Sequence, residues 1–227
     1  MQSRRDLIAT ALGTLVVAPP AFGAEKNEPE VTATEDLMRE HGILRRALLV
    51  YAECVPRLRT KPESVDANAL HRTATLFRKF GEQYHEQQLE EQHIFPVIRK
   101  MPRVASFADV LTSQHQRGRE ITAYLLERSG GGKISAAHAA PLAGALEGLV
   151  RMYEHHAAAE DTIVFPAWKT NYTNKQLDAI GDEFEEIERK TFGHDGFEDA
   201  EKTMSEIERT LGLFDLAQFT PPPPPRA

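Results

Sequence analysis

Residues 153–166, YEHHAAAEDTIVFP, are the stretch that decides the fold of this chain. A similar stretch, YHEQQLEEQHIFP, occupies residues 84–96. In both, histidine comes early, an acidic pair follows, and an aliphatic residue, phenylalanine and proline end the pattern. Two further histidines with similar polar neighbours, His41 and His115, each lie upstream of one copy. The repeat indicates two similar helix pairs, in which each first helix supplies one histidine and each second helix a His/Glu set.

Apolar residues recur at helical spacing around both copies, and no strand pattern competes. Proline and glycine breaks divide the main part of the chain into four expected helices: Thr34 to the region of Pro56 and Pro62, 64–100, 104–128 and 139–168. Long amphipathic helices joined by short breaks are typical of a helix bundle. The sequence therefore predicts an all-α fold, with an antiparallel up-down four-helix bundle over residues 34–172.

The C-terminal part of the chain differs in character from the expected bundle. Residues 173–190 and 197–211 are charged helical segments. We expect a C-terminal helical extension over residues 173–219 that packs across the bundle or mediates assembly into a homo-oligomer. Residues 220–227 include five consecutive prolines, which predict an extended, disordered tail.

Composition limits the possible functions. A chain of 227 residues with 41% hydrophobic content can bury one sizeable core, so one main domain is expected. The net charge of -7 and the absence of a basic stripe argue against nucleic acid as a partner. A single cysteine, Cys54, excludes an intramolecular disulfide and a cysteine-based metal site.

The N-terminus has the layout of a bacterial signal peptide over residues 1–23, followed by a polar linker over 24–33. The adjacent Arg4 and Arg5 resemble a twin-arginine export signal, although an ordinary secretory signal can also contain them. The apolar stretch that follows is too short for an ordinary transmembrane helix. We therefore expect a periplasmic or secreted protein without a stable membrane span after signal removal.

Helical phase selects the candidate ligands in three of the four helices. His156 and Glu160 are four residues apart, so they share one helix face, and that face is the apolar stripe. His41 and His115 also fall on the apolar stripes of their helices, whereas His155 lies about 100° from His156, at the side. Burying such groups is costly without a partner, and metal binding explains why several converge on one core.

The second helix leaves two alternatives open. His85 and Glu90 are five residues apart, or about 140° around a regular helix, so they face the same way only if the helix bulges into a π-turn. The regular alternative is Glu86 with Glu90, four residues apart. Glu90 belongs to both versions.

These residues resemble the hemerythrin, or HHE cation-binding, domain over roughly residues 34–170. The features that carry the resemblance are the His41 and His115 helices and the two His/Glu stretches that end in aliphatic-Phe-Pro. The resemblance implies a left-handed up-down bundle around a cofactor of two irons per chain. It also implies bridging carboxylates from Glu90 and Glu160 and terminal ligands His41, His85, His115 and His156.

The sequence departs from this family at one position. Oxygen-carrying hemerythrins have a second histidine one turn after the first in the third helix, and here that position is Arg119. The loss of an imidazole argues against reversible oxygen carriage. It leaves binding of, or reaction with, dioxygen, peroxide or nitric oxide, or the sensing and storage of metal. The alternatives are a site for one metal such as zinc or manganese, and a metal-free bundle that acts as a protein-interaction module.

Overall fold

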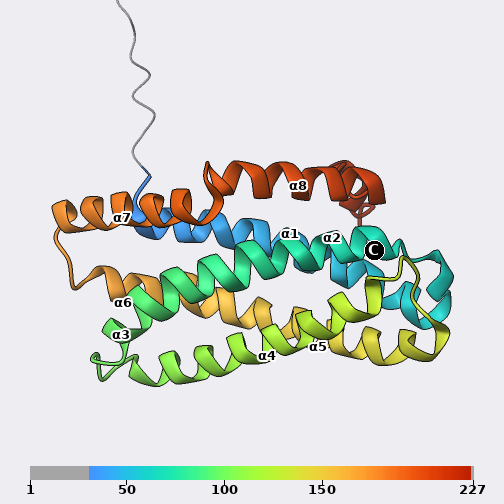
Figure 1. Ribbon diagram of the computed structural model, residues 1–227, viewed down its shortest axis with the longest axis horizontal. Helices are drawn as coiled ribbons and strands as arrows, with labels where there is room; N and C mark the ends of the chain where they lie inside the picture. The colour runs from blue at the N-terminus through green and yellow to red at the C-terminus, as the bar shows by residue number, and fades with distance from the viewer. Residues whose placement is uncertain (1–30, 226–227) are drawn as a thin grey trace, which may run out of the picture. The chain divides into compact units, whose positions relative to one another are not determined.

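The fold is taken from a computed structural model and is described for residues 31–225 (Figure 1). The predicted signal peptide and most of the predicted linker lie outside these residues. Within residues 31–225 the chain forms helices joined by short turns, and no strand, so the all-α prediction is confirmed. No helix in the same range combines the length and the apolar composition that a membrane span requires.

Four long helical stretches make up the main part of the chain. Their bounds are α1 Ala33–Thr60; α2 Ala67–Leu76 continued by η2 Phe77–Ile94 and α3 Phe95–Ile98; α4 Ala105–Ser129; and α5 Ala136–Ala159 continued by η3 Glu160–Val164 and α6 Phe165–Lys169. The hydroxyl of Thr32 accepts a hydrogen bond from the Glu35 amide and so caps α1, and the Asp66 carboxylate caps α2 in the same way. The 3-10 turn η1, Pro62–Ser64, lies between α1 and α2.

The core lies between these four stretches. Helix α1 packs against α5, α2 packs against α4, and α4 also packs against α5 and η2. The largest fully buried side chains are mainly aromatic and come from α1, η2, α3, α6 and α7: Trp168, Tyr51, Tyr84, Phe77, Phe95, Phe165 and Phe184. Each helix therefore buries one apolar face, as its spacing predicts. The up-down order of the four stretches remains a prediction.

The C-terminal helices α7, Asn174–Phe192, and α8, Gly196–Leu211, pack against α1, α2 and η2 (Figure 1). The Arg46 guanidinium on α1 donates hydrogen bonds to both Glu208 carboxylate oxygens, at 2.9 and 2.6 Å, and to the Ser205 hydroxyl at 2.8 Å. Both helices end at a glycine in the left-handed region, with φ of 79° at Gly193 and 72° at Gly212. The short 3-10 turn η4, Leu216–Phe219, follows α8.

Candidate metal centre

The six residues expected to bind metal lie together in the core. Each of them is at most 3% exposed: His41, His85, Glu90, His115, His156 and Glu160. All four helical stretches supply at least one of these residues, and groups of three or four of the side chains have ligand atoms within 4.8 Å of one another. The residues that the sequence selects as candidate ligands therefore lie together in the structure.

Glu90 lies between two pairs of histidines. Its Oε1 atom is 3.3 Å from His85 Nε2 and 4.0 Å from His41 Nε2. Its Oε2 atom is 3.2 Å from His115 Nε2. His115 Nε2 is in turn 3.1 Å from His156 Nε2. One carboxylate thus faces the His41/His85 pair with one oxygen and the His115/His156 pair with the other.

Glu160 is the second carboxylate between the pairs. Its Oε2 atom is 3.0 Å from His156 Nε2 and 3.5 Å from His41 Nε2, so it also lies between one histidine of each pair. All four carboxylate oxygens of Glu90 and Glu160, and the Nε2 atom of His85, have no hydrogen-bond partner among the described residues. Buried polar atoms without partners are rare because each carries a desolvation penalty.

The donor spacing fits metal ions. Ligand bonds of about 2.1 Å at angles of about 90–109° place neighbouring donor atoms about 3.0–3.4 Å apart. The closest separations between the imidazole and carboxylate donors are 3.0, 3.2 and 3.3 Å. Imidazole with carboxylate is also a donor set that iron accepts in helix bundles. The residues present therefore fit a metal group.

The second helical stretch is distorted as the His85/Glu90 alternative requires. Residues 77–94 form the π-helix η2, in which the hydrogen-bond step of five residues brings His85 and Glu90 to the same side. This π-helix is 18 residues long, whereas the sequence suggested a single widened turn. A shorter π-helix, η3, begins at Glu160 in the other copy of the repeat.

Proline explains where both distortions end. The Phe95 amide donates to the Glu90 carbonyl and the Phe165 amide donates to the Glu160 carbonyl, each across five residues. Proline follows both phenylalanines. A proline ring clashes with the carbonyl four residues earlier in a regular helix, and a widened turn relieves this clash. The Phe-Pro ending of the repeat is thus a local reason for the widened turn between each glutamate and the phenylalanine five residues later.

Each histidine has an outer partner that the sequence analysis missed. The Nδ1 atoms of the four rings lie 2.7 Å from Asp161, 2.5 Å from Glu40, 2.9 Å from Glu91 and 2.9 Å from Gln114, for His41, His85, His115 and His156 respectively. A hydrogen bond at Nδ1 fixes the tautomer and turns the Nε2 lone pair toward the metal.

The outer partners follow the internal repeat. Glu40 and Gln114 each precede the histidine of a first helix, whereas Glu91 and Asp161 are the second members of the two acidic pairs. Each of the four supports a histidine on a different helical stretch from its own. The repeated acidic pair was the sequence signal that could have identified two of them.

The carboxylates control the charge of the histidines. Burial lowers the pKa of His41, but hydrogen bonds to Asp161 and Glu160 outweigh burial and raise it above its usual value. Burial also lowers the pKa of His115, but the carboxylates of Glu86, Glu90 and Glu91 outweigh burial and raise this pKa to about 10. The site therefore favours positive charge, which protons or metal ions can supply.

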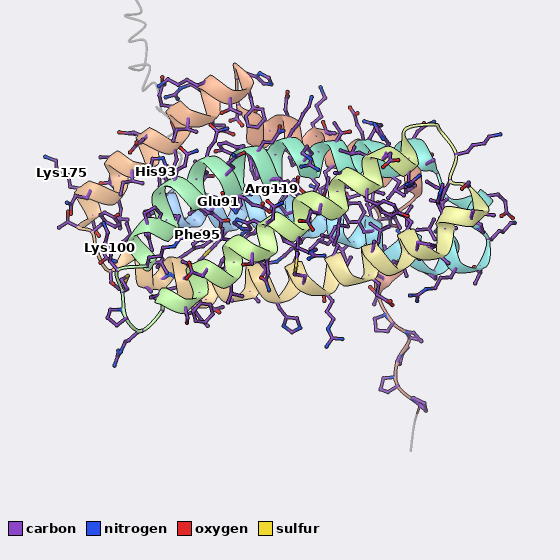
Figure 2. All side chains as sticks on the ribbon, turned by 60° about the horizontal axis from the view of Figure 1, so that its bottom comes forward. Glu91, His93, Phe95, Lys100, Arg119 and Lys175 are labelled. Atoms are coloured by element: carbon purple, nitrogen blue, oxygen red, sulfur yellow. The ribbon has the colours of Figure 1, made fainter. Side chains whose placement is uncertain are left out.

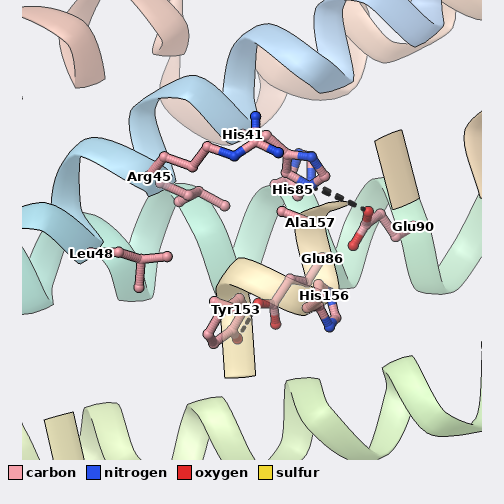
Figure 3. Close-up of a pocket in the computed structure, with 10 residues that line it drawn as sticks. His41, Arg45, Leu48, His85, Glu86, Glu90, Tyr153, His156 and Ala157 are labelled. Atoms are coloured by element: carbon pink, nitrogen blue, oxygen red, sulfur yellow. Dashed lines mark hydrogen bonds and ion pairs between the residues drawn. The ribbon is translucent and has the colours of Figure 1, made fainter. Parts of the chain in front are cut away.

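A small cavity lies beside the cluster (Figure 3). It offers about 10 Å³ for the centre of a water-sized sphere, room for about one water molecule. Glu86 and Tyr153 line it together with several of the histidines and Glu90. Both Glu86 oxygens have partners, since Oε1 accepts a hydrogen bond from Tyr153 at 2.6 Å and Oε2 lies 3.4 Å from Arg119. Of the two alternatives for the second helix, His85 therefore has the free donor atom.

Arg119, which stands where oxygen-carrying hemerythrins have a histidine, contacts two carboxylates. It pairs with Glu86 and Glu91, and Figure 2 shows Glu91 and Arg119 close to each other between η2 and α4. The exposed His155 lies outside the cluster, as helical phase predicts. The remaining histidines also lie outside it and have other neighbours: His71 with Ser129, His93 with Glu183, His138 with Ser135 and His194 with Asp199.

Comparison with known proteins agrees with this geometry. The family model of the hemerythrin HHE cation binding domain matches residues 32–168. An uncharacterized protein of Mycobacterium tuberculosis and one of Mycobacterium bovis are each 38% identical to this chain over 231 residues, covering 95% of this chain and 89% of theirs. No solved structure matches the chain significantly. Because the family model covers more than half of its length, this chain belongs to the hemerythrin HHE cation-binding family.

Proposed function

We propose that this protein is a non-haem iron protein that holds two metal ions within an up-down four-helix bundle. His41, His85, His115 and His156 would be terminal ligands, and Glu90 and Glu160 would bridge the two ions. The observation that supports this most is the set of four buried carboxylate oxygens of Glu90 and Glu160, which have no hydrogen-bond partner among the described residues. Three of these oxygens lie 3.0–3.3 Å from an imidazole nitrogen.

The chain's own residues prepare the site for cations. Asp161, Glu40, Glu91 and Gln114 hold the four rings with Nε2 directed inward. Arg45 pairs with Asp161 and Arg119 pairs with Glu91, so these two outer carboxylates are themselves fixed. Iron held by these residues would supply a redox-active Lewis acid.

The cavity beside Glu90 and His156 supports a role with a small ligand. Its size suits dioxygen, peroxide or nitric oxide better than an organic substrate, which needs several hundred Å³. Sensing or storage of metal is a related possibility, since both require the same ligands. The position of Arg119 argues against reversible oxygen carriage, because an arginine does not replace the imidazole found there in oxygen carriers.

We further propose that the protein acts outside the cytoplasm, in the periplasm or after secretion. This rests on the twin-arginine-like signal at residues 1–23, which lies outside the described residues. That export route carries folded proteins and suits a protein whose metal is loaded before export. Cell fractionation of the full-length chain, compared with a variant in which Arg4 and Arg5 are lysine, tests this directly.

Metal analysis tests the central proposal. The protein, purified without a histidine tag after expression with excess iron, should contain about two irons per chain by plasma mass spectrometry. Mössbauer spectroscopy should show the two ions to be magnetically coupled. Glu90→Gln should lose at least one iron per chain, because the bridging oxygen becomes a poor ligand.

Glu82→Gln is the matched control. Glu82 is also a buried glutamate of η2, but it lies outside the cluster. It should leave the iron content unchanged. Less than one metal per wild-type chain, or wild-type iron content in Glu90→Gln, would contradict the proposal, and one stoichiometric zinc or manganese would support the single-metal alternative.

A further inference from the structure

A second hollow lies outside the bundle core, between the second helical stretch and the C-terminal extension. Its walls are residues 72–80 of α2 and η2 and residues 192–203 at the end of α7 and in α8, and we call it the extension groove. Figure 1 shows α8 running alongside α2, against which it packs. The groove offers about 390 Å³ for the centre of a water-sized sphere, within the range of about 300–1,000 Å³ that is typical of small-molecule sites.

Small residues on α8 leave this space open. Gly196 and Ala200, one helical turn apart, line the groove together with Thr203, so this face of α8 has no large side chain that could fill it. On the opposite wall, the lining side chains of Leu76 and Phe80 are buried. The deep part of the groove is therefore apolar, and its width follows from the sequence of α8.

Contacts between the two walls close both ends of the groove. At one end, the Phe192 ring packs edge-on against Tyr84, with the ring centroids 5.2 Å apart. A Cβ atom at Gly196 would lie 2.3 Å from this Phe192 ring, so the ring occupies space that only glycine leaves free. At the other end, the Arg72 guanidinium lies 2.9 Å from the Glu206 carboxylate of α8. A hollow that is closed at both ends suits a small molecule better than an extended peptide.

Lys79 carries the one charge in the groove lining that has no partner. Of the other ionisable side chains that line the groove, Arg72 is paired with Glu206 and Asp199 with His194. The Asp199 carboxylate also raises the pKa of His194, which favours the charged form of this partner. No carboxylate of residues 31–225 lies within 4.0 Å of the exposed Lys79 ammonium. With both pairs formed, one positive charge remains at the groove.

We propose that the extension groove binds a small organic monocarboxylate, a molecule with an apolar body and one negative charge. The body would lie against Leu76, Phe80 and Phe192, and the carboxylate would pair with the Lys79 ammonium. The half-buried Thr203 hydroxyl lines the same groove and offers a second hydrogen-bond donor. An organic cation would be repelled, and a multiply charged anion would keep a charge without a partner.

This site is separate from the metal centre. None of the six proposed metal ligands lines the groove. One wall is formed by α8, which lies outside the residues 32–168 that match the family model. The inference therefore goes beyond the proposed function, and the metal content of the chain does not decide it.

Isothermal titration calorimetry of the full chain tests the proposal with four probes. Phenylpropanoate and octanoate are an aromatic and an aliphatic monocarboxylate. Phenylpropanol and phenylpropylammonium carry the same ring with no charge and with a positive charge. We expect at least one carboxylate to bind with about one molecule per chain and a Kd below about 1 mM. The alcohol should bind about five-fold more weakly than phenylpropanoate, and the ammonium compound more weakly still.

Two variants place the ligand in the groove. Ala200→Leu fills the hollow from α8 and should weaken carboxylate and alcohol alike, by about ten-fold or more. Lys79→Met keeps the apolar stem of an exposed side chain and should weaken only the carboxylates, by about five-fold. Lys100→Met is the matched control, because Lys100 is an exposed lysine that does not line the groove. It should leave all affinities unchanged.

A charge effect that is confined to the carboxylates is the result that a general packing defect would not produce. Failure of both carboxylates to bind at about 1 mM would overturn the proposal. Equal affinity for phenylpropanoate and phenylpropanol would also overturn it, as would wild-type affinity for the carboxylates in Lys79→Met. A chain that lacks metal but binds the carboxylates in this pattern would contradict only the proposed metal function.

Discussion

Replacing Gly118 with alanine should destabilise the protein by about 3 kcal/mol. The new Cβ would lie 2.2 Å from the Tyr153 hydroxyl oxygen and 3.0 Å from two ring carbons. Overpacking of this kind costs about 1–3 kcal/mol. Displacing the hydroxyl also breaks its 2.6 Å bond to Glu86, and an unpaired buried group costs about 1–3 kcal/mol more. Alanine returns up to about 1 kcal/mol through its higher helix propensity.

Gly148→Ala is the matched control. Gly148 lies on the exposed face of α5, and a Cβ there would meet no atom within 4 Å. This variant should gain up to about 1 kcal/mol. Urea denaturation of the metal-free proteins, followed by far-ultraviolet circular dichroism, gives the free energy of unfolding of both variants under the same conditions.

The double variant Gly118→Ala with Tyr153→Phe identifies the atom responsible. Removing the hydroxyl leaves the ring carbons at 3.0 Å, which small shifts can accommodate. The double variant should therefore lose at least about 1 kcal/mol less than the sum of the two single variants. If Gly118→Ala is as stable as Gly148→Ala, or the two changes at 118 and 153 are additive, the space beside Gly118 is not what holds the hydroxyl and the reasoning fails.

Two further predictions concern a buried acid and the C-terminal extension. Burial raises the pKa of Glu82 to about 7 despite its ion pair with Arg78. The native state therefore keeps a proton that the unfolded chain loses near pH 4.5. As a result, the free energy of unfolding falls as pH rises from about 4.5 through 7. The difference in free energy of unfolding between Glu82→Gln and wild type should therefore shift in favour of Glu82→Gln by up to about 3 kcal/mol between pH 5 and pH 8, as urea denaturation of the metal-free proteins measures. A difference that stays constant with pH would contradict this. Arg46→Met removes the hydrogen bonds to Glu208 and Ser205 and should speed amide exchange in α8 about 5- to 30-fold in hydrogen-exchange mass spectrometry. Exchange in α5 should stay unchanged. Equal protection of α8 in the variant and the wild type would show that apolar packing alone holds this helix.

The helices themselves could be predicted closely from the sequence. The expected third helix, residues 104–128, is α4, Ala105–Ser129, because a Met-Pro break precedes it and three glycines follow it. The inward positions of His41, His115, His156 and Glu160 also follow from sequence, since regular helical phase holds where these residues lie. Each is a buried residue in the structure.

The length of the π-helix η2 could not be predicted in the same way. A five-residue spacing between His85 and Glu90 indicates one widened turn, but how far the distortion spreads depends on packing against α1 and α4. The outer partners were missed for a related reason. Glu91 and Asp161 each follow a proposed ligand by one residue, about 100° away on a regular helix, where an acidic residue is normally solvated.

The departure at Arg119 shows why residues of this kind need the structure. In the sequence, Arg119 stands where oxygen-carrying hemerythrins have a histidine, and no pattern marks Gly118 or Tyr153 as special. In the fold, α4 presents Gly118 and Arg119 to Tyr153 and to Glu86, which come from two other helical stretches. An arginine here pairs with Glu86 and leaves no imidazole for metal, and the adjacent glycine admits a hydroxyl that a larger residue would exclude. The same region thus lacks the imidazole that the family resemblance implies and instead holds Tyr153, Glu86 and Arg119 in one hydrogen-bonded group beside the cavity, so new contacts in the fold accommodate the change at Arg119.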